Sequence, residues 1–137
     1  MRAFYLAIVG WILSASLVLA QAGLPEMPPL AERITPQVLK TLFPDADRFE
    51  VLQDGGPAAA AVFKGKDLLG YAFSTYDVLR APGYSSTPFD AIGGVSMDGH
   101  VTGGVLLFHR EPYLMNDDRR TGLMVQFLGK LNGLEAK

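Results

Sequence analysis

The apolar positions of the chain form one continuous N-terminal run and, after it, shorter runs with helical or strand-like spacing. Residues 3–20 are apolar apart from two serines and one glycine, and Arg2 is the only charge in the first 25 residues. The run ends in two overlapping small-x-small triplets, at 18–20 and 20–22. This pattern predicts a secretory signal peptide over 1–20.

An uncleaved membrane anchor is the alternative for the same segment, because an 18-residue apolar run is just long enough to span a bilayer. In either case the rest of the chain is expected on the exported side, which is the periplasm in a bacterium. Residues 21–34 contain three prolines and have no periodicity, so they predict an extended linker. The folded domain is then predicted over 35–137.

Helical spacing begins after Thr35-Pro36, where a hydroxyl can cap the first turn and proline suits the first helical position. Apolar residues follow at intervals of three and four until Pro44 ends the pattern, which predicts a helix over 36–43. A second helical pattern follows the cap Asn116-Asp117-Asp118, and Gly133 suits the position past its end. We expect its apolar stripe to face the core: Leu123, Met124, Phe127, Leu128 and Leu131.

A first hairpin is predicted between the helices. Residues 58–64 and 67–76 flank Gly65-Lys66, which suits a two-residue turn. That register places Lys64 opposite Asp67, Phe63 opposite Leu68 and Val62 opposite Leu69. In the second strand the bulky residues share a face that we expect to be buried: Leu69, Tyr71 and Phe73. The small residues share the other face, which we expect to admit a close neighbour: Gly70, Ala72 and Ser74.

A second hairpin joins 89–97 to 100–109 through Asp98-Gly99, a signal for a type I′ turn. Its register pairs Val95 with Thr102, Phe89 with Phe108, Gly94 with Gly103 and Gly93 with Gly104. Four glycines therefore meet in one patch of sheet. Either this patch admits a flat ligand or another backbone, or it marks a bulge or bend. Together the elements predict an α+β fold, with antiparallel β-hairpins packed against two or three helices.

Composition narrows the function classes. Hydrophobic residues make up 49% of the chain and charged residues 19%, which excludes a disordered acidic segment. The net charge of −2 provides no basic footprint for nucleic acid. The sequence contains no cysteine, and this excludes disulfides, iron–sulfur ligation, c-type haem, thiol catalysis and a lipoprotein anchor.

Candidate chemistry lies in two short runs. Residues 83–87 carry hydroxyls but no nucleophile elbow or placed base, so they do not indicate a serine hydrolase. The run 109–112, His-Arg-Glu-Pro, ends the last strand, and its imidazole and carboxylate can bind polar groups of a ligand. A polar loop and a surface ion cluster are the alternatives. His100 and His109 lie nine apart on one strand, on opposite faces, so they are not predicted as a metal-ligand pair.

Several of these pieces, in this order, resemble one known family. They are FPDADRF at 43–49, VFKGKDLLGYAF at 62–73, GYS at 83–85 before PFD at 88–90, and DG at 98–99 leading to HREPY at 109–113. Together they resemble the N-terminal periplasmic FMN-binding domain of NosR/NirI-type regulatory flavoproteins. That domain is related to the FMN-binding domain of RnfG-type subunits, and the resemblance covers about Thr35 to Leu134.

The resemblance implies an exported module for electron transfer to, or regulation of, nitrous oxide or nitrite reductase in denitrification, rather than a stand-alone enzyme. It also implies a membrane electron-transfer or reductase-maturation partner. Family members attach FMN to a threonine in a Ser/Thr-Gly-Ala-Thr motif, which this sequence lacks. We therefore expect non-covalent FMN, held at the positions that match the family's two motifs: Gly83, Tyr84, Ser85, His109, Glu111 and Pro112.

By this resemblance, Tyr84 packs on the flavin ring, the imidazole and carboxylate of 109–111 contact its polar groups, and the glycine patch admits the cofactor. The family's membrane helices and cysteine-rich segments are also missing. The chain is therefore expected to be the first part of such a domain, with an unpaired sheet edge and exposed core surface. The alternative is a cofactor-free periplasmic interaction module or a non-functional family fragment.

Overall fold

The computed structural model describes residues 27–52, 55–56, 58–80 and 82–136. In this part of the chain five strands form one antiparallel sheet, in the order β1-β2-β3-β4-β5. The strands are β1 Arg48–Val51, β2 Ala59–Lys64, β3 Asp67–Ser74, β4 Asp90–Ser96 and β5 Val101–Phe108. The helices are α2 Leu30–Arg33, α3 Pro36–Leu42, α4 Thr75–Val78 and α5 Asp118–Gly129. The predicted α+β class with antiparallel hairpins is confirmed.

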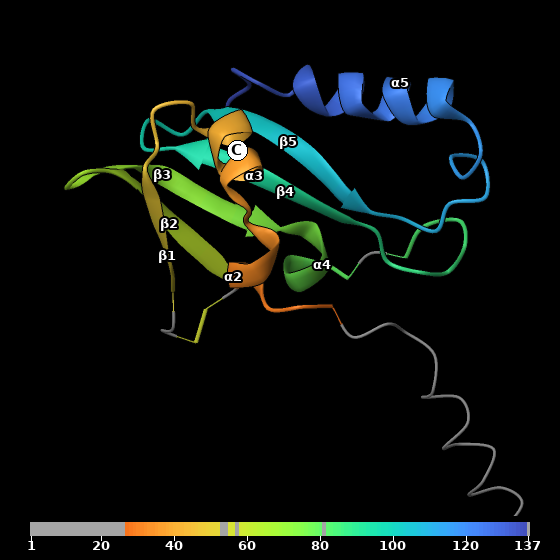
Figure 1. The fold of residues 1–137 in the computed structure, drawn as a ribbon, viewed down its shortest axis with the longest axis horizontal. Helices are drawn as coiled ribbons and strands as arrows, with labels where there is room; N and C mark the ends of the chain where they lie inside the picture. Colours follow the sequence, from red (N-terminus) through yellow and green to blue (C-terminus); the bar gives the residue numbers. More distant parts are fainter. Residues whose placement is uncertain (1–26, 53–54, 57, 81, 137) are drawn as a thin grey trace, which may run out of the picture.

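The helices α3 and α5 pack on opposite faces of the sheet. Neighbouring residues of a strand point to opposite sides, and a side chain added at Gly103 would meet Leu42 of α3, whereas one at Gly104 would meet Leu128 of α5. Figure 1 shows α2 and α3 in front of the sheet and α5 running along β5. The buried core lies between α2, α3 and the sheet: Leu30, Ile34, Val38, Leu39, Leu42, Phe43, Ala46, Ala60, Val62, Ala72 and Ile92.

The predicted helix over 36–43 is α3, and its cap is the predicted one. The hydroxyl of Thr35 accepts a hydrogen bond from the Val38 N–H at 3.3 Å. The last part of the segment predicted as a linker is folded as well, because α2 buries Leu30 and Arg33 in the domain. The predicted signal peptide or anchor over 1–20 lies outside the described residues. No helix among the described residues is long and apolar enough to cross a membrane.

The burial of β3 is the reverse of the prediction. Its small residues are buried, whereas Tyr71 is exposed and Phe73 is only half-buried. The small face does admit a close neighbour: a Cβ added at Gly70 would lie 3.0 Å from the ring of Phe43. Because α2 and α3 bring their own large side chains to this face, the strand contributes small ones. A bulge after Val62 also pairs that residue with Gly70 instead of Leu69.

The second hairpin keeps the predicted pairs of glycines but shifts on either side of them. Gly93 pairs with Gly104 and Gly94 with Gly103, while bulges pair Val95 with Val101 and Asp90 with Phe108. The turn is not type I′, because Gly99 has a positive φ of 82° and Asp98 does not. The Ser96 N–H donates to the His100 carbonyl at 2.8 Å, which closes a three-residue loop over 97–99.

The chain's own side chains fill the space over the glycine patch. A Cβ at Gly94 would lie 2.9 Å from the Phe43 ring, and one at Gly93 would lie 3.0 Å from the Phe73 ring. Leu128 covers Gly104 in the same way, at 3.3 Å. The bulge interpretation is confirmed next to Gly94. The close approach is made by two aromatic rings and a leucine, so the patch offers no bare surface to a cofactor.

The final helix forms where predicted but faces the core less than expected. The side chain of Asp117 caps α5 by accepting a hydrogen bond from the Arg120 N–H at 3.1 Å. No residue of α5 is fully buried, and Leu123 and Phe127 are 56% and 57% exposed. The helix rests on the edge strand β5, so only the side of it that carries Met124 and Leu128 is half-buried.

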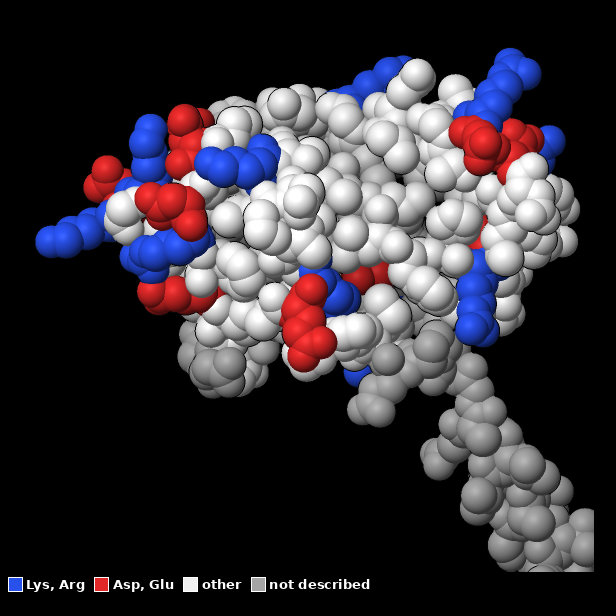
Figure 2. Space-filling view, viewed as in Figure 1, with Lys and Arg blue, Asp and Glu red and all other residues white. Residues whose placement is uncertain are grey.

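Charged side chains gather at the two ends of the face that carries α2 and α3, and the middle of that face is largely uncharged (Figure 2). At one end the β2–β3 turn carries Lys64, Lys66 and Asp67. A polar ligand on the middle of this face would therefore meet individual hydrogen-bonding groups rather than a field of one sign.

Candidate functional site

The loop between α4 and β4 contains the predicted glycine–tyrosine motif, and its base is closed. Pro82 and Pro88 form a β-bridge across it. The Gly83 N–H donates to the Thr87 carbonyl at 3.0 Å, and the Ser86 N–H donates to the Gly83 carbonyl at 3.0 Å. Ser86 adopts a positive φ of 59°, a left-handed conformation that a non-glycine residue seldom adopts. The backbone of 83–87 is thus a tight turn with a fixed shape.

Glu111 joins this turn to the segment that follows β5. One carboxylate oxygen accepts a hydrogen bond from the Tyr84 N–H at 3.1 Å, and the other accepts one from the Ser85 hydroxyl at 3.2 Å. A Cβ at Gly83 would lie 1.8 Å from the same carboxylate, so a larger residue there would displace the Glu111 side chain. Four of the six predicted site residues are therefore brought together, although 26 residues or more separate Glu111 from the turn.

We call the contact between Glu111 and the turn 83–85 the clamp, and two tyrosines lie at its outer side. The backbone N–H of Tyr84 is bound to Glu111, while the residue is 76% exposed and Tyr113 is 57% exposed. The ring centroids are 5.3 Å apart with an interplanar angle of 63°, an edge-to-face pair. Since the backbone under Tyr84 is fixed, its exposed ring can stack on a flat ligand with little ordering cost.

The other two predicted site residues, His109 and Pro112, make no described hydrogen bond to Glu111 or to the turn 83–85. His109 follows the end of β5 and is half-buried, and its Nδ1 atom is buried with no hydrogen-bond partner among the described residues. Pro112 is exposed. Arg110, between His109 and Glu111, is also exposed, and its guanidinium lies 5.9 Å from the ring centroid of Phe108.

A buried charged cluster was not predicted from the sequence. The guanidinium of Arg33 donates to the Ser74 hydroxyl and to the Asp90 carboxylate, each at 2.7 Å, and it also pairs with Asp77. The Ser74 hydroxyl donates to the other oxygen of Asp90 at 2.5 Å. Burial lowers the pKa of Arg33, but hydrogen bonds and charges from Asp90 and Asp77 outweigh it and raise the pKa overall. The cluster ties α2 to β3, α4 and β4.

Two features of this cluster bear on its role. Ser74 and Asp90 are completely buried, so no ligand reaches them in this conformation. The Nε atom of Arg33 is buried and has no hydrogen-bond partner within the described part of the chain. The cluster is therefore structural in this conformation.

The described residues contain no group of three or more histidine, aspartate or glutamate side chains that could hold a metal ion. These residues are better suited to stacking on the ring of FMN than to hydrogen-bonding with its polar groups. Tyr84 offers an exposed ring, whereas both oxygens of Glu111 already accept hydrogen bonds from the loop. Glu111 is thus a residue that positions Tyr84, and a flavin's polar groups would have to meet His109 or Arg110.

No family model matches this chain, and no curated protein matches it.

Proposed function

We propose that this domain binds FMN non-covalently and serves as a redox or regulatory module of the NosR/NirI type. The observation that carries the proposal is the clamp between Glu111 and the turn 83–85. It joins two of the motifs that carry the family resemblance, and it presents Tyr84, which is 76% exposed.

In this proposal the ring of Tyr84 stacks on the isoalloxazine, and Glu111 and Gly83 fix the loop beneath it. The imidazole of His109 is half-buried, and its buried Nδ1 has no hydrogen-bond partner among the described residues, so it can serve a polar group of the cofactor. The exposed guanidinium of Arg110 suits the phosphate, because arginine binds phosphate through two parallel hydrogen bonds. The bound flavin would supply the electron-transfer chemistry, and the protein would supply position and electrostatics.

The wider role that we propose follows from the resemblance. The domain would act on the exported side of the membrane, either released by signal cleavage or anchored by residues 1–20. It would exchange electrons with, or signal to, a membrane protein that serves nitrous oxide or nitrite reductase. It would not be a stand-alone enzyme.

Titration of the purified chain with FMN tests the proposal through the quenching of flavin fluorescence. We expect saturable binding that is lost on denaturation, with no fluorescent band on a denaturing gel. Tyr84→Ala should weaken binding by about tenfold or more, because stacking on an aromatic side chain is worth roughly 1–3 kcal/mol. Tyr71→Ala, which removes a tyrosine exposed on the sheet, is the matched control and should leave the affinity unchanged.

Three results would reject the proposal or a part of it. Absence of binding at about 100 μM FMN, an affinity too weak for a resident cofactor, would reject it entirely. Equal effects of the two tyrosine variants would reject the site. A fluorescent band on the denaturing gel would reject non-covalent attachment.

A second candidate function is a cofactor-free interaction module. It is favoured by α5, whose Leu123 and Phe127 are more than half exposed although the helix pattern is apolar. If FMN does not bind, Phe127→Ser separates this candidate from a family remnant. In an interaction module this change abolishes association with the partner while leaving the midpoint of unfolding in place.

A further inference from the structure

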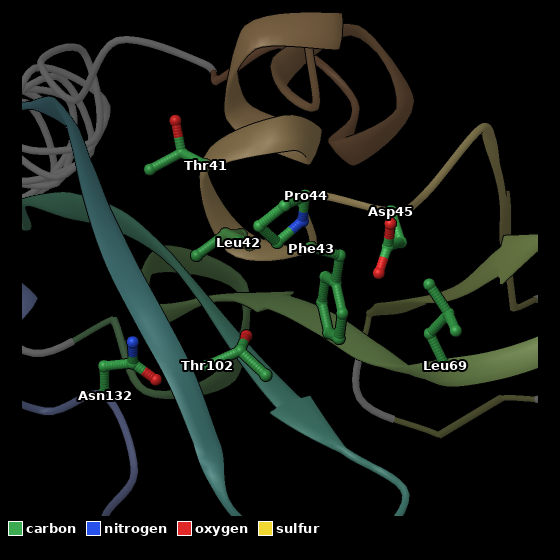
Figure 3. A pocket seen from close by; sticks show the side chains of 8 residues that line it. All are labelled: Thr41, Leu42, Phe43, Pro44, Asp45, Leu69, Thr102 and Asn132. Atoms are coloured by element: carbon green, nitrogen blue, oxygen red, sulfur yellow. The ribbon is translucent and has the colours of Figure 1, made fainter.

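A pocket of about 360 Å³ lies away from the Tyr84 loop, where four segments of the chain meet. Residues 41–45 at the end of α3 form one wall, and Leu69, Thr102 and Asn132 form the others (Figure 3). Its volume is in the range of small-molecule sites. None of the residues proposed to bind FMN lines it.

Thr102 is placed at this pocket by a bulge. Gly94 pairs with Gly103 and Val95 pairs with Val101, so Thr102 is the extra residue of β5 between them. Its hydroxyl oxygen lies 2.2 Å from where a Cβ on Gly94 would be, and only glycine leaves that space. The same oxygen is buried and has no hydrogen-bond partner among the described residues. A buried hydroxyl without a partner is a cost to the fold, which a bound polar group would relieve.

The other polar groups around the pocket differ in their availability. The Asn132 side chain is on the same side of the pocket as Thr102 in Figure 3, and it makes no hydrogen bond within the described chain. The Thr41 hydroxyl points away and donates to the Gln37 carbonyl at 2.9 Å. The Asp45 carboxylate is across the pocket, 3.5 Å from the Lys64 ammonium and largely exposed.

The remaining walls are apolar, formed by Leu42, Phe43, Pro44 and Leu69. A ligand that fits must therefore combine a compact apolar edge with groups that both donate and accept hydrogen bonds. A hydroxyl does both, as the Thr102 hydroxyl and the Asn132 amide also do. A hydroxylated six-membered ring has this combination, because its C–H edge is apolar and each of its hydroxyls both donates and accepts.

We propose that this pocket is a binding site for a monosaccharide-sized, polyhydroxylated ring. Its hydroxyls hydrogen-bond to Asn132 and to Thr102, and the apolar edge of the ring packs against Pro44 and Leu69. Asp45 then distinguishes a neutral sugar from an amino sugar, because its carboxylate attracts a protonated amine at the rim. The site is independent of the proposed FMN site.

Titration of the ¹⁵N-labelled chain, followed by amide chemical shifts, tests this proposal. The probes are glucose, N-acetylglucosamine and glucosamine, with tetrahydropyran as a ring of the same size without hydroxyls. We expect saturable shifts at residues 41–45, 102 and 132 with dissociation constants of about 1–10 mM, and none with tetrahydropyran. Glucosamine should bind more tightly than glucose at low salt and lose that advantage when the salt concentration is raised.

Two variants locate the site. Thr102→Val keeps the shape of the side chain, and Asn132→Ala removes the amide; each should weaken sugar binding by about tenfold, the value of a typical hydrogen bond. Thr121→Val, in α5, is the control and should bind as the parent does. Without sugar, Thr102→Val should leave the midpoint of thermal unfolding unchanged or raise it, because the hydroxyl it removes has no partner.

Each other outcome overturns the proposal. Absence of a saturable shift with all three sugars at about 50 mM excludes a site of useful affinity. Equal shifts with tetrahydropyran show that the pocket binds apolar rings without using its polar groups. A lowered midpoint for Thr102→Val shows that the hydroxyl has a structural partner, and unchanged binding in that variant places the sugar elsewhere.

Discussion

Replacing Arg33 by methionine removes the centre of the buried charged cluster while keeping an unbranched apolar stem. Among the described residues, the fully buried carboxylate of Asp90 then keeps the Ser74 hydroxyl as its one hydrogen-bond partner. Loss of one partner from a buried ion pair costs about 3–5 kcal/mol, because the other charge stays desolvated. A domain of this size has a free energy of unfolding of roughly 5–15 kcal/mol, so a large part of it would be lost.

Chemical denaturation of the parent and variant chains measures this cost directly. Thermal unfolding should show a fall in midpoint of about 10 °C or more, since 1 kcal/mol corresponds to roughly 4–8 °C in a domain of up to about 100 residues. Lys64→Met is the control: its partner Asp45 is 3.5 Å away and both side chains are more than half exposed. Removal of such a surface pair costs about 0–1 kcal/mol.

A double variant separates the charge from the packing. Adding Asp90→Asn to Arg33→Met removes the uncompensated carboxylate. The double variant should therefore lose less free energy of unfolding than the two single variants lose in total, by about 1 kcal/mol or more. The reasoning is refuted if Arg33→Met costs no more than Lys64→Met. It is also refuted if the double variant shows strict additivity.

Three further predictions concern other parts of the fold. Gly94→Ala should destabilise the domain by about 1–3 kcal/mol in urea unfolding, because its Cβ would lie 2.2 Å from a neighbouring hydroxyl oxygen. Gly122→Ala is the opposite case: it has open space inside α5, so stability should rise by roughly 0.5–1 kcal/mol. The hydrogen bond from the Ser96 hydroxyl holds the pKa of Asp98 below its ordinary value of 3.8, and the charge of His100 adds to this. Ser96→Ala should raise the Asp98 pKa in a carboxyl NMR titration. A lowered pKa in the folded state stabilises the fold at pH values above the ordinary pKa, and this stabilisation is lost as the pH falls and the carboxylate is protonated. The stability of the variant should therefore decrease less steeply than that of the parent as the pH falls through 4.

The elements that the sequence predicted correctly have local signals. Each helix boundary signal lies within a few residues of its helix, so no distant contact is needed to interpret it. These signals are the Thr35 cap and Pro44 for α3 and the Asp117 cap for α5. The turn glycines located both hairpins for the same reason. The short edge strand β1 was not predicted, because four residues with one alternation are too few to show a period.

The errors arise where distant residues decide the outcome. The face of β3 that is buried depends on the helices that cover it, and the bulges that shift both hairpins depend on the residues packed over them. Arg33 meets its partners across 41 and 57 residues of sequence, and it lies in a segment whose prolines suggested a linker. The apolar residues Leu30 and Ile34 near Arg33 could have suggested α2 from the sequence. They could not have identified the partners of Arg33.

The resemblance selected six residues for a cofactor site, and that site stays a prediction. The structure brings four of them together, Gly83, Tyr84, Ser85 and Glu111, but does not connect His109 or Pro112 to them by a described hydrogen bond. The direction of the hydrogen bonds changes the role of Glu111, which holds the loop instead of facing a ligand. That distinction depends on which atoms lie within 3.2 Å, which sequence spacing does not determine.

The two faces of the sheet differ in how much they contribute to stability. The α2 and α3 side contains the fully buried core and the Arg33 cluster, whereas α5, on the other side, has no fully buried residue. Stability is therefore concentrated on one face, and the exposed Tyr84 ring contributes little to it. If this division is correct, Arg33 variants should lower stability without changing the FMN affinity of the folded fraction, and Tyr84 variants should do the reverse. A Tyr84→Ala chain that unfolds as easily as Arg33→Met would show that the loop is part of the core's cooperative unit, and the proposed site would then lack the independent, preorganised loop on which it depends.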